Sequence, residues 1–405
     1  MAVTLLSNEV LDLCLGKPAL RSLSVTDTVA DALCVLKRLG DSCISVWSCH
    51  HSSESVDSTN RNVEGGAAAA AADCQCIGKV CMVDIICFIC QPENLLSPAQ
   101  ALQSPISVLI PKTSLLVRHL DPNARLLDAI DLILEGAQNL VIPIPEPKSG
   151  RKKLLEKKSS LDPTFHNNDR RYCWLTQEDV IRYLLNSIGL FSPTHSEPIN
   201  SLGVIDTKNL LTVNYDDPAS SALSLIEESL IRQSSVAIVN PEGQLIGEIS
   251  PFHLNSCNET AAAAMATLSA GDLMAYIDCG GPPDDLVQLV KERLEEQNLM
   301  GTLELMEEES GPSLTSWSSF TSTSSDEDGL SSGKNGKHGG YSARVVRRSE
   351  GTVCYPWSSL VAVMIQALAH RVSYVWVVDE DGTLTGIVTF SAMLKVFREH
   401  FKVMG

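Results

Sequence analysis

The chain has 405 residues, of which 44% are hydrophobic and 20% charged, and its formal net charge is -18. This length predicts roughly two to four domains. Such an acidic surface disfavours nucleic acid and anionic membrane surfaces as partners, because their phosphate groups would be repelled. The first residues lack the basic n-region of a secretory signal, and the most apolar run, residues 80–90, is too short to span a membrane. We therefore expect a soluble, intracellular protein, located in the cytoplasm or, as the alternative, in the nucleus.

The 13 cysteines are concentrated at the start of the chain, with nine in the first 90 residues. Their number is odd and many stand within apolar patterns, as expected for reduced, buried thiols. A metal or redox site is the alternative, since loosely spaced cysteines and histidines can supply ligands. The candidates for that alternative are Cys87 and Cys90, which form a C-x-x-C motif, and Cys49, His50, His51, Cys74 and Cys76.

The first half of the chain contains two copies of one pattern: a helical stripe that ends at a glycine, a strand, an insertion and a second strand. The stripes are Val29, Ala32, Leu33 and Leu36 before Gly40, and Leu126, Ala129, Ile130 and Ile133 before Gly136. Strands are predicted at 44–47 and 140–142, and the insertions lie at 48–74 and 145–171. Hairpin tips tolerate such insertions at little cost in folding free energy.

The second half contains two sharper copies of the pattern, separated by a fixed offset of 139 residues. The corresponding positions are Gly243, Leu245, Gly247 and Ser250 in one copy and Gly382, Leu384, Gly386 and Thr389 in the other. The helical stripes before them are Ala222, Leu225, Ile226 and Leu230, and Val361, Met364, Ile365 and Leu368. Four copies of one small α+β unit are therefore expected.

Residues 256–340 separate units 3 and 4. A helix is predicted at 283–296, and the acidic, serine-rich and glycine-rich stretch 307–340 is expected to be disordered. Ser324 and Ser325 stand three residues before Glu327 and Asp328, which is the pattern of an acid-directed kinase, so both are candidate phosphorylation sites. A flexible tether without regulation is the alternative.

The units resemble the CBS domain, the cystathionine-β-synthase type module, and the chain is similar to plant proteins of the CBSX type. VAIVNPEGQLIGEIS (236–250) and VWVVDEDGTLTGIVT (375–389) carry the resemblance most closely. It implies an α+β fold of four CBS repeats at 16–90, 105–187, 196–255 and 341–402, with long insertions and a linker at 256–340. The repeats would form two Bateman-type pairs, unit 1 with unit 2 and unit 3 with unit 4, joined sheet against sheet. The residues expected at the paired sheet faces are Val46, Leu140, Ile238 and Val377.

In CBS domains the cleft of a pair can hold an adenosine nucleotide. A Thr or Ser at the end of the second hairpin strand and an Asp three residues later bind its ribose or phosphate. Hydroxyl and N–H groups at a helix N-terminus suit a phosphate, and a carboxylate suits ribose hydroxyls. The resemblance thus implies these candidate binding residues: Asp84, Thr176, Asp179, Ser250 and Thr389.

No unit of this chain keeps the whole motif. Ala392 and His253 stand at the Asp position in units 4 and 3, and in unit 1 Cys81 stands at the hydroxyl position. Only unit 2 keeps both groups, so the first pair is the better candidate for a nucleotide site. The alternative is that these side chains only cap the helices that follow them.

The sequence contains no Gly-x-Ser-x-Gly, P-loop or His-Glu-x-x-His motif, so we expect no enzyme. The leading interpretation is a regulatory or adaptor protein that senses an adenine nucleotide (AMP, ADP or ATP), modulates a protein partner and can form a homodimer through its CBS modules. It requires no cofactor or metal. The alternatives are a ligand-free scaffold for protein–protein contact and a metal- or redox-responsive protein that uses the N-terminal cysteines.

Overall fold

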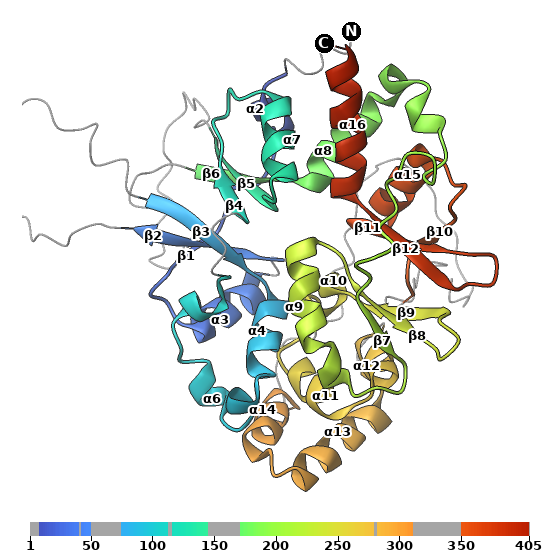
Figure 1. Cartoon of the computed structure of the whole chain (residues 1–405). Coiled ribbons are helices and arrows are strands. Elements are labelled where there is room, and N and C mark those ends of the chain that lie inside the picture. Colours follow the sequence, from blue (N-terminus) through green and yellow to red (C-terminus); the bar gives the residue numbers. More distant parts are fainter. Residues whose placement is uncertain are drawn as a thin grey trace, which may run out of the picture.

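The structure is a computed structural model, and it describes residues 8–39, 42–49, 74–111, 116–144, 171–278, 282–310 and 350–404. Four small sheets of three strands each organise the described residues (Figure 1). The strands are β1 (Ser22–Ser24), β2 (Ile44–Cys49) and β3 (Cys74–Val80); β4 (Val117–His119), β5 (Asn139–Ile144) and β6 (Arg171–Thr176); β7 (Thr212–Asn214), β8 (Val236–Val239) and β9 (Leu245–Ile249); and β10 (Val353–Cys354), β11 (Tyr374–Val378) and β12 (Leu384–Thr389).

All four sheets share one topology. The first strand is parallel to the second, and the second forms an antiparallel hairpin with the third. A parallel connection needs a crossover element, which here is a helix. The crossover helices are α3 (Val29–Leu39), α7 (Leu126–Leu134), α9 (Leu223–Arg232) after the 3-10 turn η4 (Ala219–Ala222), and α15 (Leu360–His370). The predicted α+β repeat is thus confirmed, with an additional short strand at its start.

A second helix follows the hairpin in every unit. These helices are α4 (Met82–Ile89), α8 (Gln177–Asn186), α10 (Pro251–Leu254) and α16 (Phe390–Met404). The remaining helices are α2 (Val10–Leu13) near the N-terminus; α5 (Pro92–Leu95), α6 (Pro98–Ala101) and η1 (Ile106–Leu109) after unit 1; η2 (Ile188–Phe191) and η3 (Thr194–Ser196) after unit 2; and α11 (Ala261–Thr267), α12 (Ala270–Ile277), α13 (Asp284–Glu296) and α14 (Met300–Ser310) after unit 3.

The sheets associate in the two expected pairs. Trp47 and Cys76 of unit 1 form a buried cluster with Val141 of unit 2. In units 3 and 4 the hairpin tips bond to each other: the Leu245 N–H donates to the Gly382 carbonyl at 3.1 Å, and the Leu384 N–H donates to the Gly243 carbonyl at 3.0 Å. The two glycines adopt φ near +80°, which other residues rarely adopt. The turn glycines therefore shape the tips through which this pair joins.

The helices join the units in other pairs than the sheets do: unit 1 with unit 3, and unit 2 with unit 4. One buried core contains α3 and α4 of unit 1 together with α9 to α12, and a second core contains α7 and α8 of unit 2 together with α15 and α16. Figure 1 shows α16 beside α7 and α8, and α4 beside α9. Each unit thus contacts one neighbour through its sheet and another through its helices.

The four residues expected at the paired sheet faces are fully buried, but they face the helical layer. Val46 and Ile238 lie in the first helical core, and Leu140 and Val377 lie in the second. Because side chains alternate across a strand, the residue next in line, such as Val141, faces the partner sheet instead. These strands are apolar on both faces, so their sequences did not indicate which face packs on the helices and which on the partner sheet.

The buried face of α15 also differs from the expected stripe of Val361, Met364, Ile365 and Leu368. Leu360, Val363 and Ala367 are fully buried together with Met364, whereas Ile365 is 52% exposed. This helix is apolar nearly all round, so periodicity alone could not locate its buried face.

The region after unit 3 is partly helical, and α13 coincides with the helix predicted at 283–296. The expectation of disorder from residue 307 is wrong for 307–310, which complete α14. That helix is held by Leu303 and Met306 in the first core and by the Thr302 hydroxyl, which donates to the Leu95 carbonyl at 2.6 Å. Residues 311–340, with Ser324 and Ser325, lie outside the described residues, as do 50–73 and 145–170 of the two insertions.

Candidate functional site

The predicted binding residues occupy equivalent places in the four units. Cys81, Thr176 and Ser250 are the N-cap residues of α4, α8 and α10, and the Thr389 hydroxyl accepts the Ala392 N–H at 3.3 Å in the first turn of α16. Hydroxyl groups at this position satisfy N–H groups that have no partner within the helix. Capping therefore accounts for the local geometry at Thr176, Ser250 and Thr389, and any ligand must use groups that remain available beside the cap.

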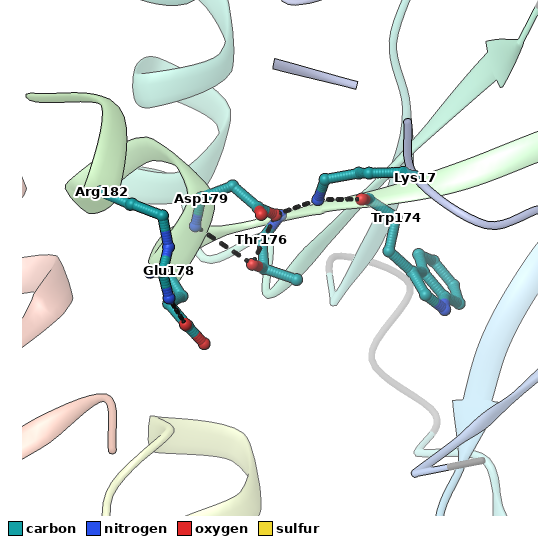
Figure 2. Close-up of polar contacts among 6 residues, drawn as sticks. All are labelled: Lys17, Trp174, Thr176, Glu178, Asp179 and Arg182. Carbon is teal, nitrogen blue, oxygen red and sulfur yellow. Dashed lines mark hydrogen bonds and ion pairs between the residues drawn. The ribbon is translucent and has the colours of Figure 1, made fainter. Parts of the chain in front are cut away.

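In unit 2, Thr176 and Asp179 form a reciprocal capping box (Figure 2). The Asp179 carboxylate accepts the Thr176 N–H and hydroxyl, each at 2.7 Å. The same carboxylate oxygen pairs with the ammonium group of Lys17, which also donates to the Trp174 carbonyl at 2.8 Å. The two residues expected to bind a ligand are therefore brought together, but a cation from the N-terminal segment lies on the carboxylate.

Asn139 is a polar residue beside Thr176 that the sequence pattern did not single out. It lies directly opposite Thr176 in the β5–β6 register, so the two side chains share one face of the sheet. It is 4% exposed, and its Nδ2 has no hydrogen-bond partner among the described residues. Buried amide groups are normally paired, so a donor without a partner beside Thr176 is unusual.

In unit 1, the Asp84 carboxylate caps α4 by accepting the Cys81 N–H at 2.6 Å. Burial raises the pKa of Asp84 to about 6, although that hydrogen bond and the nearby Lys79 ammonium oppose the shift. The Met82 N–H, at the first helical position, donates to the Asn255 side chain of unit 3 at 2.7 Å. A neighbouring unit thus already occupies the helix N-terminus that a phosphate would use.

In unit 3, side chains from unit 4 fill the space beside Ser250. The Tyr374 hydroxyl lies 3.2 Å from the Ser250 hydroxyl and donates to the Glu248 carboxylate at 2.9 Å, and the Trp376 indole N–H donates to the same carboxylate at 2.6 Å. Glu248 is 1% exposed, and burial raises its pKa to about 7 despite these hydrogen bonds. Ser250 therefore belongs to an internal polar cluster.

Thr389 of unit 4 is different, because it lines a cavity of about 330 Å³. Small-molecule sites commonly begin at about this size. Units 2, 3 and 4 all contribute to its wall. Among the polar lining residues are Asp206, Asn209, Arg232, Ser235, Thr389 and Ser391, and among the apolar ones are Ile133, Leu211, Ile231, Trp376 and Ile387.

Asp206 brings to this cavity the carboxylate that Ala392 cannot supply. Its backbone N–H and carbonyl pair with Ile387 of β12, both at 2.9 Å. Burial acts to raise the pKa of Asp206, but hydrogen bonds from the Asn209 side chain and from two backbone N–H groups, together with the Arg232 charge, outweigh it and keep this pKa below its ordinary value. Gly386 permits the close approach, because a Cβ there would clash with the Ile205 side chain. Asp206 lies 183 positions before Thr389 in the chain, so no local motif could have identified it.

The cavity contains one cationic side chain among its described lining residues, Arg232. Its guanidinium forms an ion pair with Glu228 at 2.5 Å and donates to the Asn209 carbonyl at 3.0 Å. The site can therefore offer a hydroxyl pair, a carboxylate and a partly neutralised cation around an apolar wall.

The cysteines are buried more often than exposed, as expected. Cys87 and Cys90 lie at α4, and burial raises the pKa of both thiols well above the ordinary value. Within the described ranges there is no cluster of three or more His, Cys, Asp or Glu residues that could hold a metal ion. His50 and His51 lie outside those ranges. The same ranges contain no helix with the length and apolarity that a membrane crossing requires.

Comparison with known proteins agrees with this architecture. The CBS domain model matches residues 203–255 and 358–399. The chain is 46% identical over 407 residues to CBS domain-containing protein CBSX5 of Arabidopsis thaliana, with 98% of each chain covered. It is 26% identical over 425 residues to CBSX6 of the same plant, covering 97% of this chain and 94% of the relative. The crystal structure of protein MJ1225 from Methanocaldococcus jannaschii has the same fold, with a TM-score of 0.52 at 14% identity over 96% of this chain and all of that chain. The chain therefore belongs to the family of CBS domain-containing proteins of the CBSX type.

Proposed function

We propose that this protein is a non-enzymatic regulatory or adaptor protein that binds an adenosine nucleotide (AMP, ADP or ATP) in the cavity beside Thr389 and thereby modulates a protein partner. The observation that carries the proposal is the cavity itself, which joins residues of three units at a motif position of the fourth repeat. A ligand there would contact units 2, 3 and 4 together, so its binding would be coupled to their arrangement.

The chemistry of the wall suits such a ligand. The hydroxyls of Thr389 and Ser391 lie at the start of α16, a 15-residue helix whose N-terminus favours an anion. Asp206 can accept hydrogen bonds from ribose hydroxyls. Trp376 and Ile387 supply apolar surface for a base. This assignment replaces the first pair as the preferred site, because Lys17 already pairs with Asp179 there.

Isothermal titration calorimetry of the full chain with AMP, ADP and ATP tests the proposal. We expect saturable binding that Thr389→Ala weakens and Asp206→Ala abolishes. Asp216→Ala, which removes an exposed carboxylate of the same unit outside the cavity, serves as the matched control and should bind as the wild type does. Absence of binding at millimolar nucleotide, or equal binding by the Asp206→Ala and Asp216→Ala variants, would contradict the proposal.

A ligand-free scaffold is the second candidate, and the internally occupied sites favour it. Lys17 pairs with Asp179, Asn255 occupies the α4 terminus, and Tyr374 contacts Ser250. In this case the modules would serve contact with a protein partner or a second copy of the chain. Light scattering and thermal denaturation, each with and without AMP, distinguish the two: a scaffold keeps the same mass and the same stability in both conditions.

We place the protein inside the cell, in the cytoplasm or the nucleus. No disulfide joins any two of the 11 cysteines whose side chains the structure describes, which fits a reducing compartment. Fractionation of a tagged full-length chain tests this placement.

A further inference from the structure

Two buried glutamines of unit 2 form part of the wall of the cavity beside Thr389. They are Gln138, which directly precedes β5, and Gln177, the first residue of α8. Neither residue belongs to the hydroxyl–carboxylate motif of the repeats. Each side chain ends in an amide with two N–H donors and one carbonyl acceptor. Burying such a group costs free energy unless hydrogen bonds compensate for the lost water, so the partners of the two amides are informative.

The last turn of α9 in unit 3 fixes the orientation of the Gln138 amide. The Nε2 of Gln138 donates to the Leu230 carbonyl at 2.8 Å and to the Ile231 carbonyl at 2.7 Å. Because both partners can only accept, the nitrogen must face α9, and both of its N–H groups are used. The Oε1 of Gln138 has no hydrogen-bond partner among the described residues. Gln138 therefore offers the cavity an acceptor that amide rotation cannot exchange for a donor.

The amide of Gln177 lacks partners at both ends. The residue is 7% exposed, yet neither its Oε1 nor its Nε2 forms a hydrogen bond with any of the described residues. Buried side-chain amides are normally paired, so an unpaired one on a cavity wall indicates a ligand that supplies the missing hydrogen bonds. Rotation of this amide can present either a donor or an acceptor. Gln177 is thus the adaptable member of the two, and Gln138 is the fixed one.

We propose that Gln138 and Gln177 read the edge of the ligand's base and select a 6-aminopurine, an inference that rests on the proposed binding of an adenosine nucleotide in this cavity. The 6-amino group donates a hydrogen bond to the Oε1 of Gln138, and a ring nitrogen accepts one from the Nε2 of Gln177. Glutamine amides pair with the amino group and a ring nitrogen of adenine when proteins read DNA. Unit 2 thereby supplies base specificity, while Asp206 and Thr389 hold the ribose and the phosphate.

A 6-oxopurine presents the opposite chemistry to Gln138. Hypoxanthine and guanine carry a carbonyl oxygen at position 6, which would face the Oε1 acceptor. Two acceptors cannot share a hydrogen bond, and Gln138 cannot reverse its amide without leaving the Leu230 and Ile231 carbonyls unpaired. A site whose buried polar groups are left unpaired by the wrong ligand discriminates strongly against that ligand. Inosine monophosphate, which keeps the ribose and phosphate of AMP, should therefore bind more weakly than AMP.

Calorimetric titration of the full chain with AMP and with inosine monophosphate tests the proposal. The wild type should bind AMP about tenfold more tightly or better, on the scale of one base contact of this kind. Gln177→Met, which keeps the length of the side chain and removes the amide, should weaken AMP binding roughly tenfold and reduce the preference. Gln138→Met should abolish the preference. Gln288→Met, at an exposed residue of α13 outside the cavity, is the matched control and should keep the wild-type ratio of affinities.

The ratio of the two affinities separates base reading from a structural role, because a change that only disturbs the fold weakens both nucleotides alike. The wild-type ratio tests the selection even if a variant fails to fold. Equal binding of AMP and inosine monophosphate by the wild type would overturn base reading and leave nucleotide binding in place. Failure of both nucleotides to bind would overturn the two proposals together. A preference for AMP that survives both Gln138→Met and Gln177→Met would overturn the assignment to these residues.

Discussion

The carboxyl group of Glu248 is buried between two sheets, where Tyr374 and Trp376 donate hydrogen bonds to it. Glu248 alternates with apolar residues in β9, a pattern that predicts an exposed side chain. Its burial is explained by the partner sheet, which covers this face of the strand. Because burial raises the pKa of Glu248 from 4.5 to about 7, the folded protein retains this proton after the unfolded chain has lost it. Stability therefore falls as the pH rises from about 4.5 to about 7, and remains lower above that range.

We predict that Glu248→Gln reduces this pH dependence. The wild-type free energy of unfolding should fall by about 3 kcal/mol from this group between pH 4.5 and pH 8, at the scale of about 1.4 kcal/mol for each unit of pKa. Urea denaturation at a series of pH values measures the slope. Asp84, whose pKa burial raises to about 6, also lowers stability as the pH rises. Part of the decrease in unfolding free energy should therefore persist in Glu248→Gln and disappear only when Asp84→Asn is added. An unchanged slope in the double variant would contradict the assignment.

The candidate site could be predicted only in part at the residue scale. The sequence motif correctly indicated Thr176, Ser250 and Thr389 as N-terminal helix residues, because strand, turn and cap follow one another locally. It gave no sign of Lys17 or Asp206, which reach their sites from distant segments. Whether a motif hydroxyl lines a cavity or is covered depends on such long-range contacts, which no local pattern encodes.

At the scale of elements, the sequence predicted the crossover helices and hairpins but omitted the first strand of every unit. These strands, β1, β4, β7 and β10, have two or three residues each, too few to show an alternating pattern. They form only because a longer parallel strand lies beside them. The hairpin glycines, by contrast, were identifiable from the turn pattern alone.

Two glycines of the β11–β12 hairpin should respond differently to alanine. Gly382 has φ +80°, and a methyl group added there would have no atom within 4 Å, so Gly382→Ala should cost about 1–2 kcal/mol of stability through backbone strain. Gly386→Ala should instead displace Ile205, lower stability by about 1–3 kcal/mol through overpacking, and weaken any ligand bound beside Asp206. Urea denaturation and calorimetry measure the two effects.

Gly189→Ala is the matched control for this pair, because Gly189 has neither a positive φ nor a neighbour within 4 Å of an added methyl group. Its stability should stay close to that of the wild type. If Gly382→Ala weakened ligand binding as strongly as Gly386→Ala, close packing at Ile205 would not be the cause.

At the scale of the whole molecule, helices of unit 2 and unit 4 are joined by an ion pair as well as by their apolar faces. The Arg398 guanidinium of α16 binds the Asp131 carboxylate of α7 through two nitrogens, at 2.5 and 3.0 Å. We predict a coupling energy of about 0.5–1 kcal/mol in a double-mutant cycle of Arg398→Ala and Asp131→Ala, because both side chains are partly exposed. Additive effects of the two changes would show that the pair contributes nothing.

The two helical cores also predict how the chain tolerates division. A cut of the chain between units 2 and 3, within residues 192–198, would divide each of the two cores between the two fragments. Each core contains helices from both halves of the chain. We expect each half alone to aggregate, since it exposes large apolar helix faces. The halves should form a stable complex when produced together. Two monomeric, well-folded halves in size-exclusion chromatography would contradict this expectation.

The ion pair between Lys17 and Asp179 has a quantitative consequence for unit 2. Because Lys17 belongs to the same chain, its ammonium group competes for Asp179 as an intramolecular partner, whose effective concentration does not depend on the protein concentration. A diffusing molecule that needs this carboxylate must exceed that tethered competitor in concentration multiplied by affinity. The Lys17 contact would therefore lower the apparent affinity of any ligand that needs the Asp179 carboxylate, by a factor that the strength of the ion pair sets.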